Sequence, residues 1–282
     1  MAEISGFTIL RNGVKYDYPF IESIKSILPI VDEMIVAIGK SEDDTVAAVK
    51  SINSGKIRVI ETVWDLANNK NGSEFARQTN IALKECKKPW AFYLQADEVV
   101  HENDLEAVRQ AVDRYNDDRA VDGLTFDYIH FEANYKYYNP FRYKSAVRIV
   151  RTTPDIISIK DAAEFGKTDG LKLRTAKSGA RMFHYGWVKS PKIMLEKMKS
   201  FEKFWHNDSY VNNKYAGLEE YDFKMLEVSK IFHGSHPAVM TERVNNYDLI
   251  LPKAVPRRPL LLRKRTWFIL LRKWGLIKKE WF

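Results

Sequence analysis

The chain has 282 residues, of which 45% are hydrophobic and 13% aromatic. This composition excludes an intrinsically disordered chain, and the length suffices for one large domain or two small ones. A single cysteine, Cys86, excludes an intramolecular disulfide and a cysteine-based zinc site. No segment approaches the roughly 18 uncharged apolar residues that cross a bilayer, and the amino terminus carries no apolar run of signal-peptide length. We therefore expect a cytoplasmic protein.

The net charge of +8 is concentrated near the carboxyl terminus. Residues 253–282 contain ten Lys or Arg and one acid, Glu280, which gives this segment a charge of +9. The remaining residues contain 35 basic and 36 acidic side chains. A nearly neutral body with one basic segment indicates a local anionic partner and argues against a general nucleic-acid-binding surface. We expect no nucleic-acid partner.

The first hundred residues alternate short apolar runs with helical periodicities, which predicts an α/β domain with a largely parallel sheet. A capping box from Ser41 to Asp44 predicts that a helix begins at Ser41, and Gly55 is placed to end it. The predicted strands are 4–10, 34–38, 56–60 and 90–94, and the predicted helices are 18–28, one from Ser41 and one that opens at Ser73.

The second half of the chain has a different pattern. It contains longer apolar runs, then a glycine-rich stretch, then helical periodicity that prolines interrupt. We expect the helical part to pack on the sheet and not to fold alone. Predicted in order are a helix around 105–112, strands within 123–151, loops over 154–180, a last strand at 180–185 and a helix from Pro191 to about Trp205.

Two acids follow the strand predicted at 90–94, and the carboxyl ends of strands in open α/β sheets are where ligands bind. Asp97 and Glu98 at such a position are suitable ligands for Mg²⁺ or Mn²⁺. The alternative is a helix cap or a solvated acid pair. His184 also ends a predicted strand, and it gains functional interest only if it lies close to Asp97.

Several segments in order resemble glycosyltransferase family 2, in the branch of the lipopolysaccharide core glucosyltransferases. They are FTILRNGVKYDYPFIESIKSILPIVDEMIVAIGKSEDDT, GSEFARQTNIAL, WAFYLQADEVV and FHYGWVK, and together they span residues 4 to about 200. The resemblance implies the GT-A fold, a Rossmann-like α/β domain with a mixed, mostly parallel central sheet. We expect a nucleotide-sugar-binding and catalytic domain at 1–190, a helical extension packed on it at 191–252 and a basic amphipathic tail at 253–282.

The resemblance also implies roles for residues that bind the donor, a nucleotide-diphosphate sugar. Asp97 becomes a ligand of Mn²⁺ or Mg²⁺, and His184 a contact to the metal or the diphosphate. Gln95 occupies the position of the usual first acid of this motif, and Ile38-Gly39 stand where the family usually has an acid that reads the nucleobase. The residues expected to line or face the donor site are Arg11, Asn12, Arg77, Asn80 and Gln95.

Inverting members of the family use a carboxylate to deprotonate the acceptor hydroxyl. The segment KDAAEFGK places Glu164 at the glutamate of the His-Glu pair of the core glucosyltransferases, with Ala163 in place of the histidine. Asp161 is close enough in sequence to compete for this role. Either acid is alternatively an ordinary loop carboxylate.

The basic tail carries aromatic and leucine side chains at helical spacing, at Trp267, Leu270, Leu271 and Trp274. This pattern is typical of a helix that lies on an anionic membrane surface, and we expect residues 257–282 to make a peripheral contact on the inner face of the cell membrane. A terminal helix docked on its own domain and a partner-binding helix are the alternatives. The aromatic run 135–143 is suited to stacking on a sugar or to packing.

The sequence thus predicts a metal-dependent, inverting hexosyltransferase that acts on a glycolipid or cell-surface glycan, such as a lipopolysaccharide or polysaccharide precursor. A second hypothesis is a degenerate relative that binds a sugar nucleotide or glycan without turnover, for which Ile38 and Gln95 argue. A nucleotidyltransferase is disfavoured because the expected Gly-rich, basic amino-terminal loop is missing.

Overall fold

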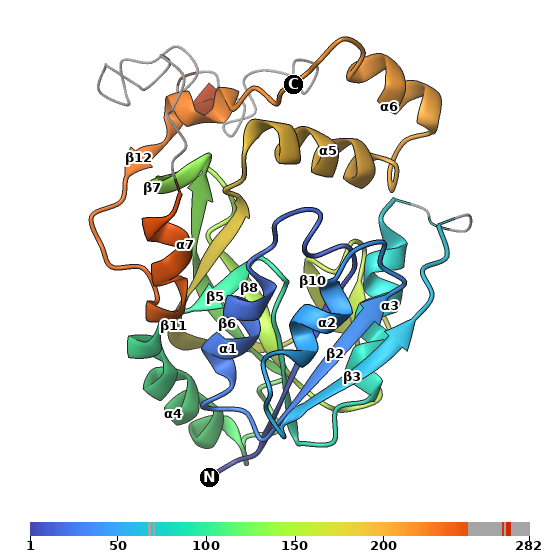
Figure 1. The fold of residues 1–282 in the computed structure, drawn as a ribbon. Helices are drawn as coiled ribbons and strands as arrows, with labels where there is room; N and C mark the ends of the chain where they lie inside the picture. The colour runs from blue at the N-terminus through green and yellow to red at the C-terminus, as the bar shows by residue number, and fades with distance from the viewer. Residues whose placement is uncertain (67–68, 70, 248–266, 268, 272–282) are drawn as a thin grey trace.

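A ten-stranded mixed sheet with helices on both faces forms the centre of the protein (Figure 1). The computed structural model describes residues 1–66, 69, 71–247, 267 and 269–271. The strands are β1 (Ile4–Leu10), β2 (Glu33–Gly39), β3 (Ile57–Thr62), β4 (Trp90–Tyr93), β5 (Glu98–Val100), β6 (Gly123–Glu132), β7 (Asn134–Tyr138), β8 (Ser145–Arg151), β9 (Ile156–Ile159), β10 (Glu164–Lys167), β11 (Thr175–Trp187) and β12 (Lys230–Ile231). The α-helices are α1 (Phe20–Ile27), α2 (Thr45–Lys50), α3 (Ser73–Lys84), α4 (Leu105–Tyr115), α5 (Pro191–Glu202), α6 (Asp208–Lys214) and α7 (Thr241–Asn245).

The strand order along the sheet is β12-β7-β6-β8-β4-β1-β2-β3. The four strands β3, β2, β1 and β4 are parallel, and β8, β6, β7 and β12 continue the sheet in antiparallel pairs. The long strand β11 pairs in parallel with β6 and antiparallel with β5. The predicted α/β class is therefore confirmed, with a mixed sheet that is parallel at its core.

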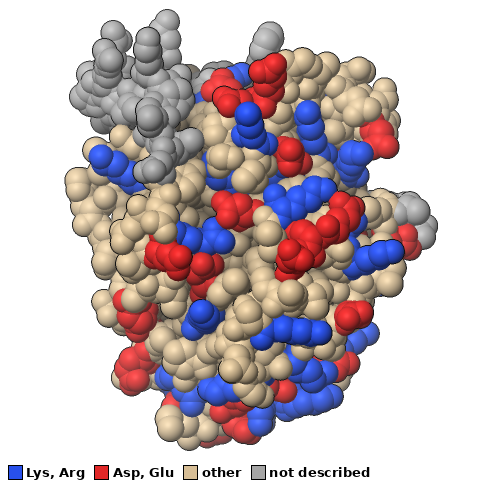
Figure 2. Space-filling view, viewed as in Figure 1, with Lys and Arg blue, Asp and Glu red and all other residues tan. Residues whose placement is uncertain are grey.

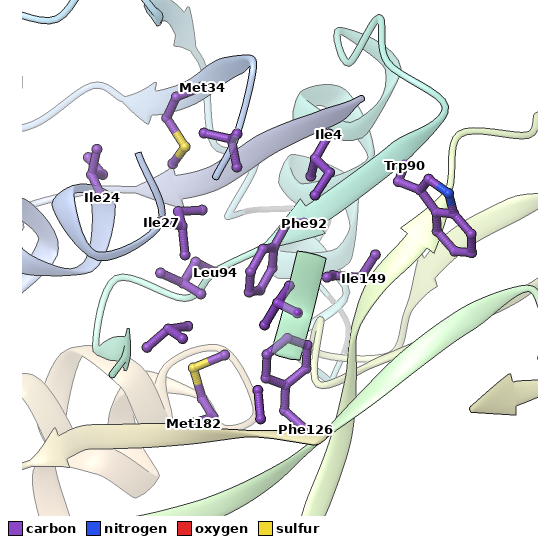
Figure 3. Packing of buried hydrophobic residues seen from close by; sticks show 14 of the residues in the cluster. Ile4, Ile24, Ile27, Met34, Trp90, Phe92, Leu94, Phe126, Ile149 and Met182 are labelled. Carbon is purple, nitrogen blue, oxygen red and sulfur yellow. The ribbon is translucent and has the colours of Figure 1, made fainter. Parts of the chain in front are cut away.

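The parallel strands are buried on both faces, which explains their nearly continuous apolar runs. Alternate residues of one strand enter opposite layers: Ile4 contributes to the layer shared with α1 and α4, and Phe7 to the layer shared with α3. Figure 3 shows the first layer, where Ile24 and Ile27 of α1 join the apolar side chains of the sheet. Each large side chain buried in this way contributes about 1.5–3 kcal/mol.

Three local predictions are wrong in detail. No helix begins at Ser41, because its Oγ bonds the Asn12 amide and the Gly39 carbonyl, and α2 starts only at Thr45. The stretch 154–180 is not all loop, since β9 and β10 form an antiparallel hairpin there. The last strand extends over Thr175–Trp187 because its outer residues pair with the full length of β6.

A buried ion pair joins the two halves of the sheet at the end of β4. Arg148 of β8 donates to both carboxylate oxygens of Glu98 at 2.8 Å, and the two side chains are 1% and 0% exposed. The Tyr128 hydroxyl donates to the same carboxylate at 2.6 Å. Glu98 is therefore occupied by structural bonds, which leaves Asp97 as the member of the acid pair that faces the strand edge.

No helix within the described residues is long and apolar enough to cross a membrane. The predicted tail at 253–282 lies outside the described residues except for 267 and 269–271. The domain boundaries at 190 and 252 stay predictions.

Replacing Arg148 with Met should lower the free energy of unfolding by about 3–5 kcal/mol, because the charge of Glu98 then stays buried without its partner. Urea denaturation measures this change. The matched control is Arg58→Met, which breaks the Arg58–Glu85 pair at 43% and 40% exposure. It should cost less than about 1 kcal/mol. Equal losses in the two variants would contradict the structural role of the buried pair.

Candidate active site

The carboxyl ends of β1, β2, β3 and β4 lie together at one edge of the sheet, and α5 lies across this edge (Figure 1). The segment 95–97 follows β4 at this edge, and β11 returns beside β5 so that His184 pairs with Glu98. Helix α5 begins directly after β11, where Ser190 caps it by accepting from the Ile193 amide at 3.3 Å. Three chain segments therefore meet at Asp97.

Asp97 is 9% exposed and faces two basic side chains. Its Oδ1 is 3.7 Å from His184 Nε2, and its Oδ2 is 3.6 Å from Lys197 Nζ on α5. Gly186 of β11 must be a glycine for steric reasons. A Cβ at this position would lie 2.6 Å from Asp97 Oδ2 and 2.8 Å from His184 Cε1. The structure thus places the two predicted metal ligands together.

The electrostatics of this cluster keep Asp97 ionised. Burial raises the pKa of its carboxyl, but the basic side chains that face it and a backbone hydrogen bond outweigh burial, so the pKa of Asp97 lies below its ordinary value. The basic side chains are His184, Lys197 and Lys189, and where the His184 ring is neutral the lysines supply the positive charge. A carboxylate that stays charged in a nearly dry site is available to a cation or a hydrogen-bond donor.

The hydrogen bonds of His130 determine the tautomer of His184. His130 Nε2 lies 2.9 Å from the Tyr143 carbonyl, which only accepts, so this nitrogen carries the proton. Burial, followed by the neighbouring His184, lowers the pKa of His130 to about 2, so the ring is neutral and its Nδ1 accepts. The His184 Nδ1 at 3.2 Å must then donate. His184 consequently presents the lone pair of Nε2 to Asp97.

This arrangement is suited to a divalent cation. Burial lowers the pKa of His184 even though Asp97 opposes the shift, so its neutral imidazole is a ready nitrogen ligand. A lone pair and a carboxylate oxygen that face each other at 3.7 Å fit the nitrogen and oxygen donors that Mn²⁺ accepts. Within the described part of the chain no cluster of three or more His, Cys, Asp or Glu could hold a metal ion. The described residues bring two such side chains, Asp97 and His184, together at this position.

Two buried lysines at the site were missed by the sequence analysis. Lys197 Nζ donates to the Gly186 carbonyl at 2.8 Å, and Lys189 Nζ to the Asp17 carbonyl at 2.8 Å. Both ammonium groups lie over the ring of Tyr18, at 4.8 and 4.4 Å from its centroid. Burial lowers the pKa of each lysine.

A signal for Lys197 was present in the sequence. It lies on the helical stripe formed by Met194, Met198 and Phe201, and a cation within an apolar stripe indicates either an ion pair or a ligand. Lys189 gives no such signal, because it lies between a strand and a helix.

On the face shown in Figure 2, Lys and Arg side chains are intermixed with Asp and Glu. The positive charge near Asp97 comes from the buried lysines described above.

Two small cavities of about 130 and 60 Å³ lie between the β1 loop and α5. Arg11 and Asn12, which are predicted to lie beside the donor, line both cavities. Asn12 adopts a left-handed conformation (φ 53°), and its side chain accepts from the Glu42 amide at 2.8 Å. Arg11 Nε bonds the Lys40 carbonyl at 3.3 Å. The larger cavity adjoins the end of β2, and the smaller one reaches Lys197.

The two predicted residues of α3 are held by structural bonds. Arg77 pairs with the buried carboxylate of Glu74 at 2.7 Å, and Asn80 exchanges two hydrogen bonds with the Ser158 backbone at 2.7 and 2.9 Å. Gln95 bonds through its backbone, with its amide donating to Glu98 at 3.0 Å and its carbonyl accepting from Ser23 at 3.1 Å.

The candidate bases lie on the β9–β10 hairpin. Glu164 has a 59% exposed side chain and pairs with Lys160 at 2.7 Å. The carbonyl of the neighbouring Ala163 accepts a hydrogen bond from Arg148 at 3.2 Å. This bond connects the hairpin to the buried Arg148–Glu98 ion pair. Asp161 lies against Gly72 at the start of α3. No direct contact between these two acids and Asp97 appears among the described residues.

An indole ring occupies the position where the family usually has a nucleobase-reading acid. A Cβ on Gly39 would overlap the ring of Trp64, which packs edge-on against Phe75 and Phe204. The Trp64 Nε1 is buried without a hydrogen-bond partner in the described residues.

The pH dependence of the free energy of unfolding tests whether His130 is buried in its neutral form. Below about pH 6.5 the unfolded chain binds a proton at this position that the folded chain excludes, so the free energy of unfolding falls as the pH falls. Between about pH 7 and pH 5 this group should account for a loss of about 2 kcal/mol in metal-free buffer. His130→Gln should remove that part of the loss, measured by urea denaturation, and the exposed control His233→Gln should keep it. A wild-type pH dependence in His130→Gln would contradict the assignment.

Comparisons with known proteins give one family match and several similar solved structures. Residues 11–162, more than half of the chain, match the family described as Glycosyl transferase family 2. A search of curated proteins finds no significant match. Among solved structures, S. aureus TarS aligns at 15% identity over 76% of this chain and 42% of its own, with a TM-score of 0.41. This chain therefore spans about two fifths of the length of that protein.

Two further structures carry nucleotide sugars. S. aureus TarS 1–349 in complex with UDP-GlcNAc aligns at 14% identity over 74% of this chain and 69% of its own, with a TM-score of 0.41. The mannosyltransferase PcManGT from Pyrobaculum calidifontis, in complex with GDP-Man and Mn²⁺, aligns at 16% identity over 46% of this chain and 36% of its own, with a TM-score of 0.35. On the match over residues 11–162, this chain belongs to glycosyl transferase family 2.

Proposed function

We propose that this protein transfers a hexose from a nucleotide-diphosphate sugar to a glycan or lipid-linked acceptor. The observation that carries the proposal is the ionised Asp97 facing the Nε2 lone pair of His184 and the ammonium of Lys197, at the sheet edge where ligands of α/β domains bind. Family membership supports glycosyl transfer as the reaction class.

Asp97 and His184 would hold a divalent cation, Mn²⁺ or Mg²⁺. Such an ion neutralises negative charge on the departing diphosphate. The imidazole nitrogen favours Mn²⁺, because Mg²⁺ prefers oxygen ligands. Arg11 and Asn12 line the adjoining cavities and would contact the nucleotide.

For the acceptor side we retain Glu164 as the general base of an inverting displacement, with Asp161 as the competing acid. Glu164 would have to exchange its ion pair with Lys160 for the acceptor hydroxyl. The exposed position of both side chains makes this exchange inexpensive, since ion pairs in solvent contribute about 0–1 kcal/mol. Arg77 would bind phosphate only after release from Glu74, which is costlier because that carboxylate is 3% exposed and would lose its charged partner.

The acceptor we propose is a lipopolysaccharide or polysaccharide precursor at the inner face of the cell membrane. The basic segment 257–282 supports this choice by its charge and its aromatic residues. Deleting residues 257–282 should lower cosedimentation with anionic liposomes more than it lowers turnover on a soluble acceptor. Equal sedimentation of the two proteins would contradict membrane binding by this segment.

A second candidate function is binding of a sugar nucleotide without turnover. Gln95 in place of an acid and Trp64 packed on Gly39 are the observations that favour it. Donor hydrolysis separates the two candidates, because an active transferase slowly passes its sugar to water even without the acceptor. Nucleotide binding with neither hydrolysis nor transfer across many acceptors would favour the binding protein.

A nucleotide panel tests the donor site directly. UDP, GDP, CDP and dTDP should be compared with and without Mn²⁺ by thermal shift, since a ligand that binds the folded state raises its apparent stability. We expect one base to give a Mn²⁺-dependent shift that disappears in Asp97→Asn. The exposed carboxylate variant Asp127→Asn is the control and should keep the shift. Absence of a shift with all four nucleotides would contradict the donor site.

A further inference from the structure

Lys197 stands between the metal-binding candidates and the cavities beneath α5. Its Nζ is 3.6 Å from Asp97 Oδ2, and its side chain is 12% exposed. It lines the smaller cavity together with Arg11 and Tyr18. One of its three N–H donors goes to the Gly186 carbonyl at 2.8 Å and another faces Asp97, which leaves one for a group in the cavity.

Basic side chains outnumber carboxylates around this ammonium. Among the described residues Lys197 has one carboxylate within 4 Å and the fully buried Lys189 has none. Within the described residues the Lys189 ammonium donates to the carbonyl of Asp17, whose carboxylate is paired with Arg243 at 2.6 Å. A buried ammonium without an anionic partner is unfavourable. The cluster is therefore complementary to an added anion on the cavity side.

We propose that Lys197 binds a phosphate oxygen of the donor's diphosphate and holds that group beside Asp97. The inference rests on the proposed function and assigns the phosphate contact to α5, a helix outside the segment that matches the family. The diphosphate is the one part of a nucleotide sugar that carries the required negative charge. The uncharged hexose and nucleobase do not complement an ammonium.

Lys197 would stabilise the negative charge that develops on the departing diphosphate during transfer. The bond between the anomeric carbon and the β-phosphate oxygen breaks, and its electron pair stays on that oxygen. The acceptor oxygen forms the new bond to the anomeric carbon, and its proton passes to the carboxylate base. A fixed ammonium beside the leaving oxygen stabilises the added negative charge without rearranging.

The test is a comparison of nucleoside diphosphates with their nucleosides by calorimetry in Mn²⁺ buffer. Lys197→Met should weaken binding of the diphosphate by at least about tenfold, the loss typical of one charged hydrogen bond. Binding of the matching nucleoside should change by less than about threefold. Lys197→Arg should restore most of the diphosphate affinity, and Lys192→Met on the exposed side of α5 should leave it unchanged. Melting temperatures without ligand confirm that each variant is folded.

A second measurement tests whether Lys197→Met weakens diphosphate binding indirectly, by weakening Mn²⁺ binding. Mn²⁺ affinity without nucleotide, measured by electron paramagnetic resonance, should be unchanged or higher in Lys197→Met, because a positive charge next to Asp97 has been removed. A parallel loss of Mn²⁺ affinity would overturn the phosphate contact. If the wild-type protein binds a diphosphate and Lys197→Met binds it equally well, the role of Lys197 alone is overturned. If the wild-type protein binds none of the four diphosphates, the proposed function falls as well.

Discussion

The candidate site depends on a carboxylate that remains charged although it is almost completely buried. Burial alone would favour the neutral acid of Asp97, and the basic groups facing it, together with a backbone hydrogen bond, lower its pKa. Those groups come from distant parts of the chain, namely the end of β11, the following loop and α5. The ionised state of Asp97 therefore requires the complete fold.

The neighbouring acid, Glu98, has a structural role that differs from the environment of Asp97. Glu98 points to Arg148 and Tyr128, which use both of its oxygens to join β5 to the antiparallel strands. With Glu98 fixed, the chain turns Asp97 toward His184, and Gly186 leaves the space that this approach needs. Glu98 is thus held by structural bonds, whereas Asp97 faces His184 and Lys197.

Most of the fold could be predicted because it follows from local patterns. The apolar runs of β1, β2 and β4 alternate with amphipathic helices, and this order leaves few arrangements other than a parallel core. A carboxylate directly after such a strand must lie at the ligand-binding edge, so Asp97 could be identified. The capping prediction at Ser41 failed because a distant partner, Asn12, uses the hydroxyl that the cap requires.

The rest of the site could not be predicted because it depends on tertiary contacts. Nothing in a single sequence places α5 over the sheet edge, so Lys197 could be noticed as a cation in an apolar stripe but not assigned a partner. The tautomer of His184 follows from His130, 54 residues away in sequence. Conversely, Arg77 and Asn80 share the expected helix face, but bonds to Glu74 and Ser158 occupy both side chains.

The most direct test of the account is a crystal structure with Mn²⁺ and the nucleoside diphosphate that the protein binds. We expect an anomalous Mn²⁺ peak in contact with Asp97 and His184 Nε2, and diphosphate oxygens bound to that ion and to Lys197. A diphosphate bound elsewhere on the protein, or a Mn²⁺ peak away from Asp97, would contradict the central claim that this buried carboxylate organises the donor site.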